Sequence, residues 1–339
     1  MMKRTTALMM TLIMLLSLVF CSATSVFASD GNGSQDTYLI RIGHSDTTTN
    51  LIHTYLEKFK ADVEKKTDGQ VEIVIYASED LGSNAEMAKM VTMGNLEGMM
   101  MPSGQESSYA PRMKVLSLPF LFSDYEEVYK VLDGEIGDDM VTDLAEHNLI
   151  QIAWWENGLR QITNNVHPIE KPEDLEGLKI RIPDDQMTEA IFEAYGASPS
   201  FYAFSELYNA LKQDEFDGQE NPVANIYSNK FQDVQSYLAM VNYQYQPKNM
   251  VFNLDVWNEI PEDLQEIIMD SAVSYGLQHR QAVTENEADM LEELEAAGME
   301  ISYPDIDPFI EASQSVYDDF YAEYDWAEQL VTDIRDLNK

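Results

Sequence analysis

Hydrophobic and polar residues follow two periods in the first part of the chain, one typical of strands and one typical of helices. Apolar stretches at residues 38–42 and 71–76 predict two strands. Between them, residues 50–66 predict a helix from apolar side chains at helical spacing, which are Leu51, Ile52, Tyr55, Leu56, Phe59 and Val63. A strand, a helix and a strand in this order form a right-handed unit with parallel strands. The carboxyl ends of such strands face a ligand crevice.

The same alternation continues over the rest of the chain and predicts an α/β fold. Further strands are predicted at residues 98–101, 149–155, 178–182, 237–243 and 248–253. Further helices are predicted at residues 85–93, 124–132, 188–195, 206–211 and 261–297. The last helix opens with Pro261 and two acidic residues, as helix starts prefer.

The first residues have the order of a secretory signal peptide. Lys3 and Arg4 precede an apolar stretch at residues 7–20, and small residues lead up to Ala28. The apolar stretch is shorter than the roughly 20 residues that a membrane span needs. We therefore expect cleavage after Ala28, a flexible segment at residues 29–35, and export to the periplasm or another site at the outer face of the membrane.

The single cysteine, Cys21, lies within the segment expected to be removed. The mature chain is then expected to have no disulfide, no thiolate metal site and no cysteine nucleophile. Lipid attachment at Cys21 is an alternative that stays open. Against it, Phe20 is bulky where a lipoprotein signal has a small residue.

Length and charge restrict the classes of function. Removal of the signal peptide leaves about 310 residues, which favours two domains because single cores stop growing near ~250 to 300 residues. The formal net charge is −39, and loss of Lys3 and Arg4 would make it −41. Such a protein does not bind nucleic acid or anionic lipid through a general field. Solubility or adaptation to salt accounts for this charge.

The sequence lacks motifs for catalysis. With 60 acidic residues, carboxylate pairs occur everywhere by chance and do not identify a glycosidase. The five histidines are scattered, with no HExxH pair and no Cys/His cluster. The chain also has no GxSxG elbow, no GxxxxGK[ST] loop and no GxGxxG after a strand. We therefore expect a protein that is not an enzyme and that has no metal and no cofactor.

Two arginines in the middle of the chain are candidates for chemistry. Arg160 follows a predicted turn at residues 157–158 and precedes a predicted loop at residues 163–165. Arg181 lies on a predicted strand just before Pro183. In one reading they form salt bridges with local carboxylates, such as Glu156, Glu173 or Asp184. In the other, a planar guanidinium presents two parallel N–H donors that match the carboxylate of a ligand.

The segment around these arginines resembles the solute-binding proteins of tripartite ATP-independent periplasmic (TRAP) transporters, which include dicarboxylate, uronate and sialic acid binders. The matching stretches are NGLRQITNN, PEDLEGLKIRIP, GASPSFYAFSELYNALK and DGQENPVANI. DLGSNAEM and LSLPFLF upstream and IPEDLQ downstream support the match. The resemblance covers nearly the whole mature chain in order, with about one extra residue between the two arginines.

The resemblance implies roles for residues of the second predicted lobe. Arg181 is similar to the family arginine that clamps the substrate carboxylate, and Arg160 to a second arginine that contacts the same anion or supports the first. Asn221 resembles the asparagine that hydrogen-bonds the carboxylate, and Phe204 the aromatic that packs on the substrate, although core packing is its alternative. Trp155 matches an aromatic that lines the cleft or is buried. Glu206 and Glu220 are interpreted as scaffold that holds loops or arginines in place.

The first predicted lobe departs from the sialic acid binders, which have polar or acidic groups after the first strand, after an LG pair and in the next strand. At those places this sequence has Ser45, Ser83 or Asn84, and Pro102. His44, Ser45 and Asn84 are therefore candidate ligand contacts, and sialic acid is disfavoured.

The resemblance implies a two-lobed periplasmic-binding-protein-like fold, in which each lobe has a mainly parallel sheet flanked by helices and a long helix spans both. Lobe I would be residues 36–157 with 247–285, and lobe II residues 158–246 with 286–339. The implied function is capture of a small organic acid, such as a sugar acid, uronate or C4 dicarboxylate, and its delivery to a TRAP membrane permease by a monomer. A binding protein that serves a sensor and a secreted enzyme remain as alternatives.

Overall fold

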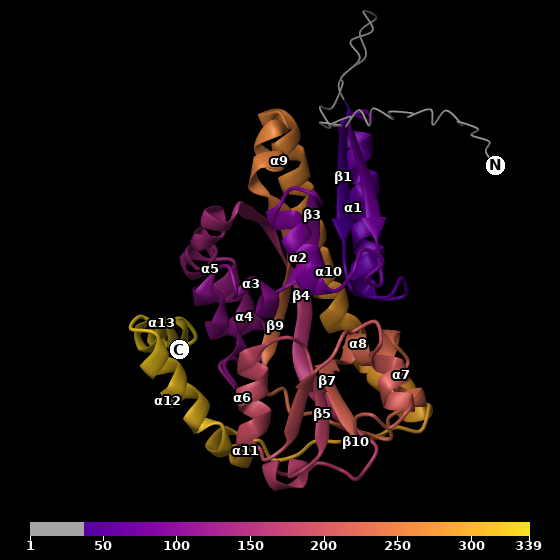
Figure 1. Cartoon of the computed structure of the whole chain (residues 1–339), viewed down its shortest axis with the longest axis vertical. Coiled ribbons are helices and arrows are strands. Elements are labelled where there is room, and N and C mark those ends of the chain that lie inside the picture. Colours follow the sequence, from indigo (N-terminus) through magenta and orange to yellow (C-terminus); the bar gives the residue numbers. More distant parts are fainter. Residues whose placement is uncertain (1–36) are drawn as a thin grey trace, which may run out of the picture. The chain divides into compact units, whose positions relative to one another are not determined.

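The structure, a computed structural model, describes residues 37–339 (Figure 1). The expected signal peptide, Cys21 and the segment at residues 29–35 lie outside the described residues. Within the described range, no helix is both long enough and apolar enough to cross a membrane.

The chain begins with the predicted pair of parallel strands and their connecting helix. β1 (Tyr38–Gly43) pairs in parallel with β2 (Val71–Tyr76), and α1 (Leu51–Lys66) joins them. The side chain of Asn50 accepts a hydrogen bond from the backbone N–H of Ile52 and so caps α1. α2 (Asn84–Thr92) then leads to β3 (Gly98–Pro102), which pairs with β1. This confirms the first predicted unit.

Two long strands connect this half of the sheet with a second half. β4 (Leu149–Asn164) pairs antiparallel with β9 (Tyr245–Asn253), which also pairs with β3. Beyond that contact, β4 pairs with β7 (Gly218–Pro222) and β8 (Tyr237–Ala239). Figure 1 shows β4 and β9 side by side in the middle of the sheet.

The predicted turn at residues 157–158 and the predicted loop at residues 163–165 are wrong in detail. β4 continues to Asn164, with a break in register between Glu156 and Gly158 where the strand bulges. Gly158 has a φ of 129° there, which its lack of a Cβ permits. Asn–Gly pairs favour bulges as well as turns, and only the partner strands, which lie far away in sequence, decide between them.

The second half of the sheet has its own parallel strands. β5 (Lys179–Ile182) lies between β7 and β6 (Ser198–Phe201) and is parallel to both. α6 (Gln186–Ala194) follows β5, and α7 (Leu207–Lys212) follows β6. The strand order is β2-β1-β3-β9-β4-β7-β5-β6, and β10 (Glu300–Ser302) pairs with β8. β8 is shorter than the strand predicted at residues 237–243.

Helices flank the sheet. α10 (Glu262–Ala296) is the predicted long helix, and it contacts α1, β4 and α8 (Val223–Ser228). The remaining α-helices are α3 (Ser103–Glu106), α4 (Tyr125–Leu132), α5 (Glu135–Met140), α8 (Val223–Ser228), α9 (Leu254–Glu259), α11 (Asp307–Ala312), α12 (Gln314–Glu323) and α13 (Ala327–Leu337). Short 3₁₀ helices are η1 (Pro111–Ser117), η2 (Thr142–His147), η3 (Pro172–Leu175) and η4 (Phe231–Asp233). The predicted α/β class and the long helix are confirmed, and the boundaries of the two lobes stay a prediction.

Candidate ligand-binding site

Two adjoining hollows open where several strands of the sheet end. The outer hollow has a volume of about 360 Å³ and the inner hollow about 50 Å³. Both are lined by Asn84, Pro102, Arg181, Pro183, Phe204 and Gln246. Pro102 ends β3, and Arg181 is the last residue but one of β5. The hollows therefore lie at the carboxyl ends of strands from both halves of the sheet, the place at which α/β proteins bind ligands.

Arg181 is a buried cation without an anionic partner. Its Nε and Nη2 donate hydrogen bonds to the backbone carbonyl of Tyr202 at 2.9 and 2.6 Å. Among residues 37–339, no carboxylate oxygen lies within 4.0 Å of its guanidinium nitrogens. Burial lowers the pKa of Arg181 to about 10, although the nearby charge of Glu220 opposes this. The side chain is thus still positively charged at neutral pH, and it lines both hollows.

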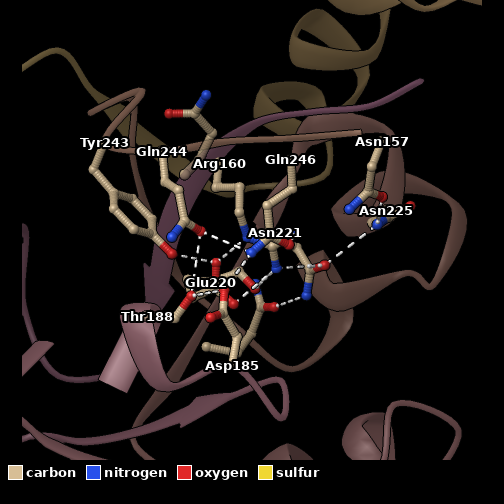
Figure 2. A network of polar contacts seen from close by, with 12 residues as sticks. Asn157, Arg160, Asp185, Thr188, Glu220, Asn221, Asn225, Tyr243, Gln244 and Gln246 are labelled. Atoms are coloured by element: carbon tan, nitrogen blue, oxygen red, sulfur yellow. Dashed lines mark hydrogen bonds and ion pairs between the residues drawn. The ribbon is translucent and has the colours of Figure 1, made fainter. Parts of the chain in front are cut away.

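Arg160, by contrast, is fully engaged within the protein. Its Nη2 donates to Glu220 Oε1 at 2.7 Å, and its Nε donates to the other oxygen of the same carboxylate. The hydroxyl of Tyr243 also donates to Glu220, at 2.5 Å (Figure 2). Burial opposes the charge of Arg160, but the adjacent Glu220 carboxylate raises the pKa of Arg160 above its usual range. The charge of Arg160 is therefore compensated by a residue on the neighbouring strand β7.

Neither arginine forms an ion pair with Glu156, Glu173 or Asp184 within the described range. The salt-bridge reading of the sequence thus holds for Arg160, with a different partner, and has no support at Arg181.

Side-chain amides form one wall of the inner hollow. Asn221 Oδ1 accepts from Arg160 Nη2 and from Asn225 Nδ2, both at 3.3 Å. Asn225 Nδ2 also donates to Asn157 Oδ1 at 3.0 Å. On the facing strand, Gln246 Oε1 accepts from Arg160 Nη1 at 3.2 Å, and Figure 2 shows these groups converging around the arginine. The network fixes the positions of several amide groups beside Arg181.

The opposite wall comes from the first half of the sheet. Ser45 follows β1, is buried and lines the inner hollow. Asn84 begins α2, and its Oδ1 is buried without a hydrogen-bond partner among the described residues. Lys248 Nζ donates to both carboxylate oxygens of Asp46, at 2.8 and 2.6 Å. Burial disfavours the charged form of Asp46, but Lys248 and His44 together hold its pKa below the usual range.

Phe204 lies beside the free arginine. Its ring centroid is 5.6 Å from Arg181 Cζ, and the same ring packs edge-on against Phe231. Phe204 is only partly buried and lines both hollows. It is therefore placed both to pack on a ligand and to contribute to the core.

Residues 42–324 match the bacterial extracellular solute-binding proteins of family 7 (DctP). The chain belongs to this family. The resemblance to TRAP solute-binding proteins seen in the sequence is thereby confirmed.

Several relatives agree with this membership. The chain is 30% identical over 283 residues to the 2,3-diketo-L-gulonate-binding periplasmic protein YiaO of Escherichia coli. The aligned region covers 84% of this chain and 85% of that protein. A TRAP periplasmic solute-binding protein of Polaromonas, solved bound to D-erythronate, has a TM-score of 0.84 and 30% identity, covering 88% of this chain and 98% of that one. One from Chromohalobacter salexigens, with bound D-glucuronate, has a TM-score of 0.85 and 29% identity, covering 88% and 99%.

Within this DctP family protein, the structure brings six of the predicted site residues together. Arg160, Arg181, Asn221, Phe204, Ser45 and Asn84 all line the inner hollow. Two others lie elsewhere in the described structure. Trp155 is fully buried, and its Nε1 donates to the carbonyl of Ala272 at 3.0 Å. His44 is also fully buried, and its Nε2 lies 3.0 Å from Nδ1 of His53.

The scaffold residues differ in what they do. Glu220 binds Arg160, as described above, whereas Glu206 is exposed at the start of α7 and lines neither hollow. Ser83 lines the outer hollow, but its hydroxyl caps α2 and interacts with Glu86.

Other residues that line the inner hollow were missed from the sequence: Asn157, Asn225, Gln246 and Lys248. Two signals could have found them. Gln246 and Lys248 occupy alternate positions of the buried strand β9, and Gln244 continues the same spacing just before it, which places polar side chains on one face of the strand. Asn225 follows Asn221 by four residues, close to the start of α8.

Proposed function

We propose that this protein captures a small organic acid outside the cytoplasmic membrane and delivers it to a TRAP membrane permease. One observation carries the proposal. Arg181 is charged, buried and without a carboxylate partner within residues 37–339, at the point where the two hollows meet. A buried unpaired charge is costly for a protein to maintain unless a ligand compensates it.

The carboxylate of the ligand pairs with Arg181 in this proposal. The guanidinium edge not bonded to Tyr202 is open to a ligand, and a planar guanidinium matches the geometry of a carboxylate. The Asn221 amide gives one N–H to Gln219 Oε1 and donates its second N–H to the same carboxylate, and Phe204 packs against the body of the ligand. Arg160 supports Asn221 and does not itself contact the anion.

The rest of the ligand contacts Ser45 and Asn84 across the site. Closure of the two lobes over it removes water, which strengthens the ion pair. Hydrogen bonds between the predicted lobes support such closure: Glu79 Oε2 accepts from Ser205 N at 3.1 Å, and Asn50 Nδ2 donates to Asn225 Oδ1 at 2.9 Å. The permease then recognises the closed form of an exported monomer.

A thermal-shift screen of the mature protein tests the proposal. A ligand that binds only the folded state at 100 times its Kd stabilises by about 2.7 kcal/mol, so a matching acid raises Tm by several degrees. The panel contains sugar acids, uronates and C4 acids, with the corresponding neutral sugars and amines as controls. Stabilisation by neutral sugars or amines alone contradicts the proposal. Uptake of the acid into vesicles that contain the permease tests the delivery step. We expect uptake only when this protein is added.

A further inference from the structure

The charges around the inner hollow leave a single cation free. Three cationic side chains line this hollow, Arg160, Arg181 and Lys248. Arg160 is compensated by Glu220, and Lys248 is compensated by Asp46 through two short hydrogen bonds. Both pairs are buried, with at most 4% of any of the four side chains exposed. Breaking such a pair leaves an uncompensated buried charge, so neither carboxylate is readily displaced by a ligand.

The outer hollow offers no second cation either. Among its lining residues, Arg181 is the only cationic one, whereas Glu79, Asp184 and Asp185 carry carboxylates. Asp185 Oδ2 already accepts hydrogen bonds from Thr188 Oγ1 and Gln246 Nε2 within the protein. Glu79 is held at the edge of the hollow because it accepts a hydrogen bond from the backbone N–H of Ser205. A second carboxylate on a ligand anchored at Arg181 would therefore meet acidic groups on this side, and like charges brought together in a site are unfavourable.

The remaining polar groups are uncharged and suit hydroxyl groups. Ser45 presents a hydroxyl, Asn157 an amide, and Asn84 a buried carbonyl oxygen that has no hydrogen-bond partner among the described residues. A ligand hydroxyl both donates and accepts, so it satisfies these groups. An acceptor-only carboxylate cannot donate to Asn84 Oδ1, and it would leave that oxygen unpaired at a cost.

We propose that the ligand is a hydroxylated monocarboxylate, and that the site rejects the dicarboxylate with the same carbon skeleton. The inference rests on the function proposed above and specifies which organic acids fit. Discrimination comes from two sources, the lack of a free second cation and the presence of the Glu79, Asp184 and Asp185 carboxylates in the same hollow as Arg181. Both act mainly against the second carboxylate, because Arg181 compensates the charge of the first.

Matched pairs of acids test the inference by titration calorimetry on the mature protein. D-Erythronate and meso-tartrate share four carbons and the two central hydroxyl groups, and they differ only in whether the far end is an alcohol or a carboxylate. D-Gluconate and D-glucarate form the corresponding six-carbon pair. In the pair that binds more tightly, we expect the affinity for the monocarboxylate to be at least about tenfold higher than the affinity for the dicarboxylate. Like-charge contacts in a site cost more than the roughly 1.4 kcal/mol that corresponds to a tenfold change.

The outcomes separate this inference from the proposed function. A dicarboxylate that binds as tightly as its monocarboxylate partner, or more tightly, overturns the inference and leaves the capture of organic acids standing. If none of the acids binds while a neutral sugar or an amine does, the proposed function fails and the inference fails with it.

Two variants test the electrostatic reason. In Glu79→Gln combined with Asp184→Asn, the preference for the monocarboxylate should fall about threefold to tenfold, because the dicarboxylate gains affinity. Glu72→Gln is the matched control, since Glu72 is an exposed residue of β2 outside both hollows. A preference that stays the same in the double variant overturns the electrostatic basis of the inference.

Discussion

Glu220 binds the guanidinium of Arg160 through both of its carboxylate oxygens, and both side chains are almost completely buried. The pair joins the neighbouring strands β4 and β7, with Arg160 at one end of the paired segment and Glu220 at its middle. It also fixes Asn221, whose Oδ1 accepts from the same guanidinium. One buried pair thus holds a candidate binding residue in place while its own charges are compensated within the protein.

Removing one partner of this pair should destabilise the protein strongly. Glu220→Gln leaves the Arg160 charge buried and uncompensated, which costs on the order of 3 to 5 kcal/mol. Urea denaturation followed by circular dichroism measures this loss in the free energy of unfolding. Glu292→Gln, at an exposed position of α10, is the control and should change it by less than about 0.5 kcal/mol. Equal stability of the two variants would mean that the pair contributes nothing.

Arg181 should be the most sensitive position for affinity, and Arg181→Lys should fail almost as badly as Arg181→Ala. Lysine keeps the charge but loses the paired N–H donors. Loss of one partner of a buried charged pair costs on the order of 2 to 5 kcal/mol, which is roughly a thirtyfold to several-thousandfold loss of affinity. Titration calorimetry with the acid found in the thermal-shift screen measures the effect.

Arg335→Lys, in α13, is the control for this experiment, because that arginine lines neither hollow. Arg160→Ala should cost less affinity than Arg181→Ala, since Arg160 is already paired with Glu220. Binding by Arg181→Lys within threefold of the parent protein would contradict a bidentate contact and would reduce Arg181 to a structural role.

The sequence predicted most of the first half of the sheet because its strands and helices have regular apolar periods. β2 was predicted with its observed bounds, and α1 to within one residue. β7 was missed because Gln219, Glu220 and Asn221 are polar yet completely or almost completely buried. Periodicity detects strands that bury apolar side chains. In β7 the buried side chains are polar, and the charge of Glu220 is compensated by Arg160 from β4.

The candidate site shows the same division between local and distant information. Arg181, Asn221 and Phe204 were identified through stretches that resemble the TRAP binders, and they do line one hollow. Lys248 and Asp46 are 202 residues apart, so nothing local indicates their pairing. The sequence indicated Glu220 as scaffold for loops or arginines, but it did not show that Glu220, and not Glu156, compensates Arg160. Charge balance in a site depends on contacts that only the fold establishes.

Stability should decrease between about pH 4.5 and pH 8 because of Glu106. Burial raises the pKa of Glu106 to about 8, although a hydrogen bond from Asn249 opposes this. Since the folded state then keeps a proton that the unfolded state releases above its own pKa of about 4.3, rising pH favours unfolding across this window. Glu106→Gln removes this effect. Between pH 5 and pH 8, the free energy of unfolding of the parent should fall by about 2 to 4 kcal/mol more than that of the variant.

Urea denaturation at several pH values from 5 to 8 checks this difference. Burial also raises the pKa of Glu156, to about 7, so part of the slope should persist in the Glu106→Gln variant. Glu292→Gln again serves as the exposed control and should keep the slope of the parent protein. The same slope in the parent and in Glu106→Gln would show that Glu106 is ionised in the folded state.

Gly276 lies where α10 crosses β4, and Gly276→Ala should destabilise the protein. A Cβ at this position would be 2.8 Å from the carbonyl oxygen of Trp154 and 2.9 Å from Cδ1 of Trp155. In an open helix, alanine is more favourable than glycine by about 1 kcal/mol. Here the helix or the strand must move, and such overpacking costs about 1 to 3 kcal/mol, so we expect a net loss of stability. Ser274→Ala, at an exposed position two residues earlier in the same helix, should instead be neutral or slightly stabilising in the same urea titration. A Gly276→Ala protein as stable as Ser274→Ala would mean that α10 can move away from β4 without cost.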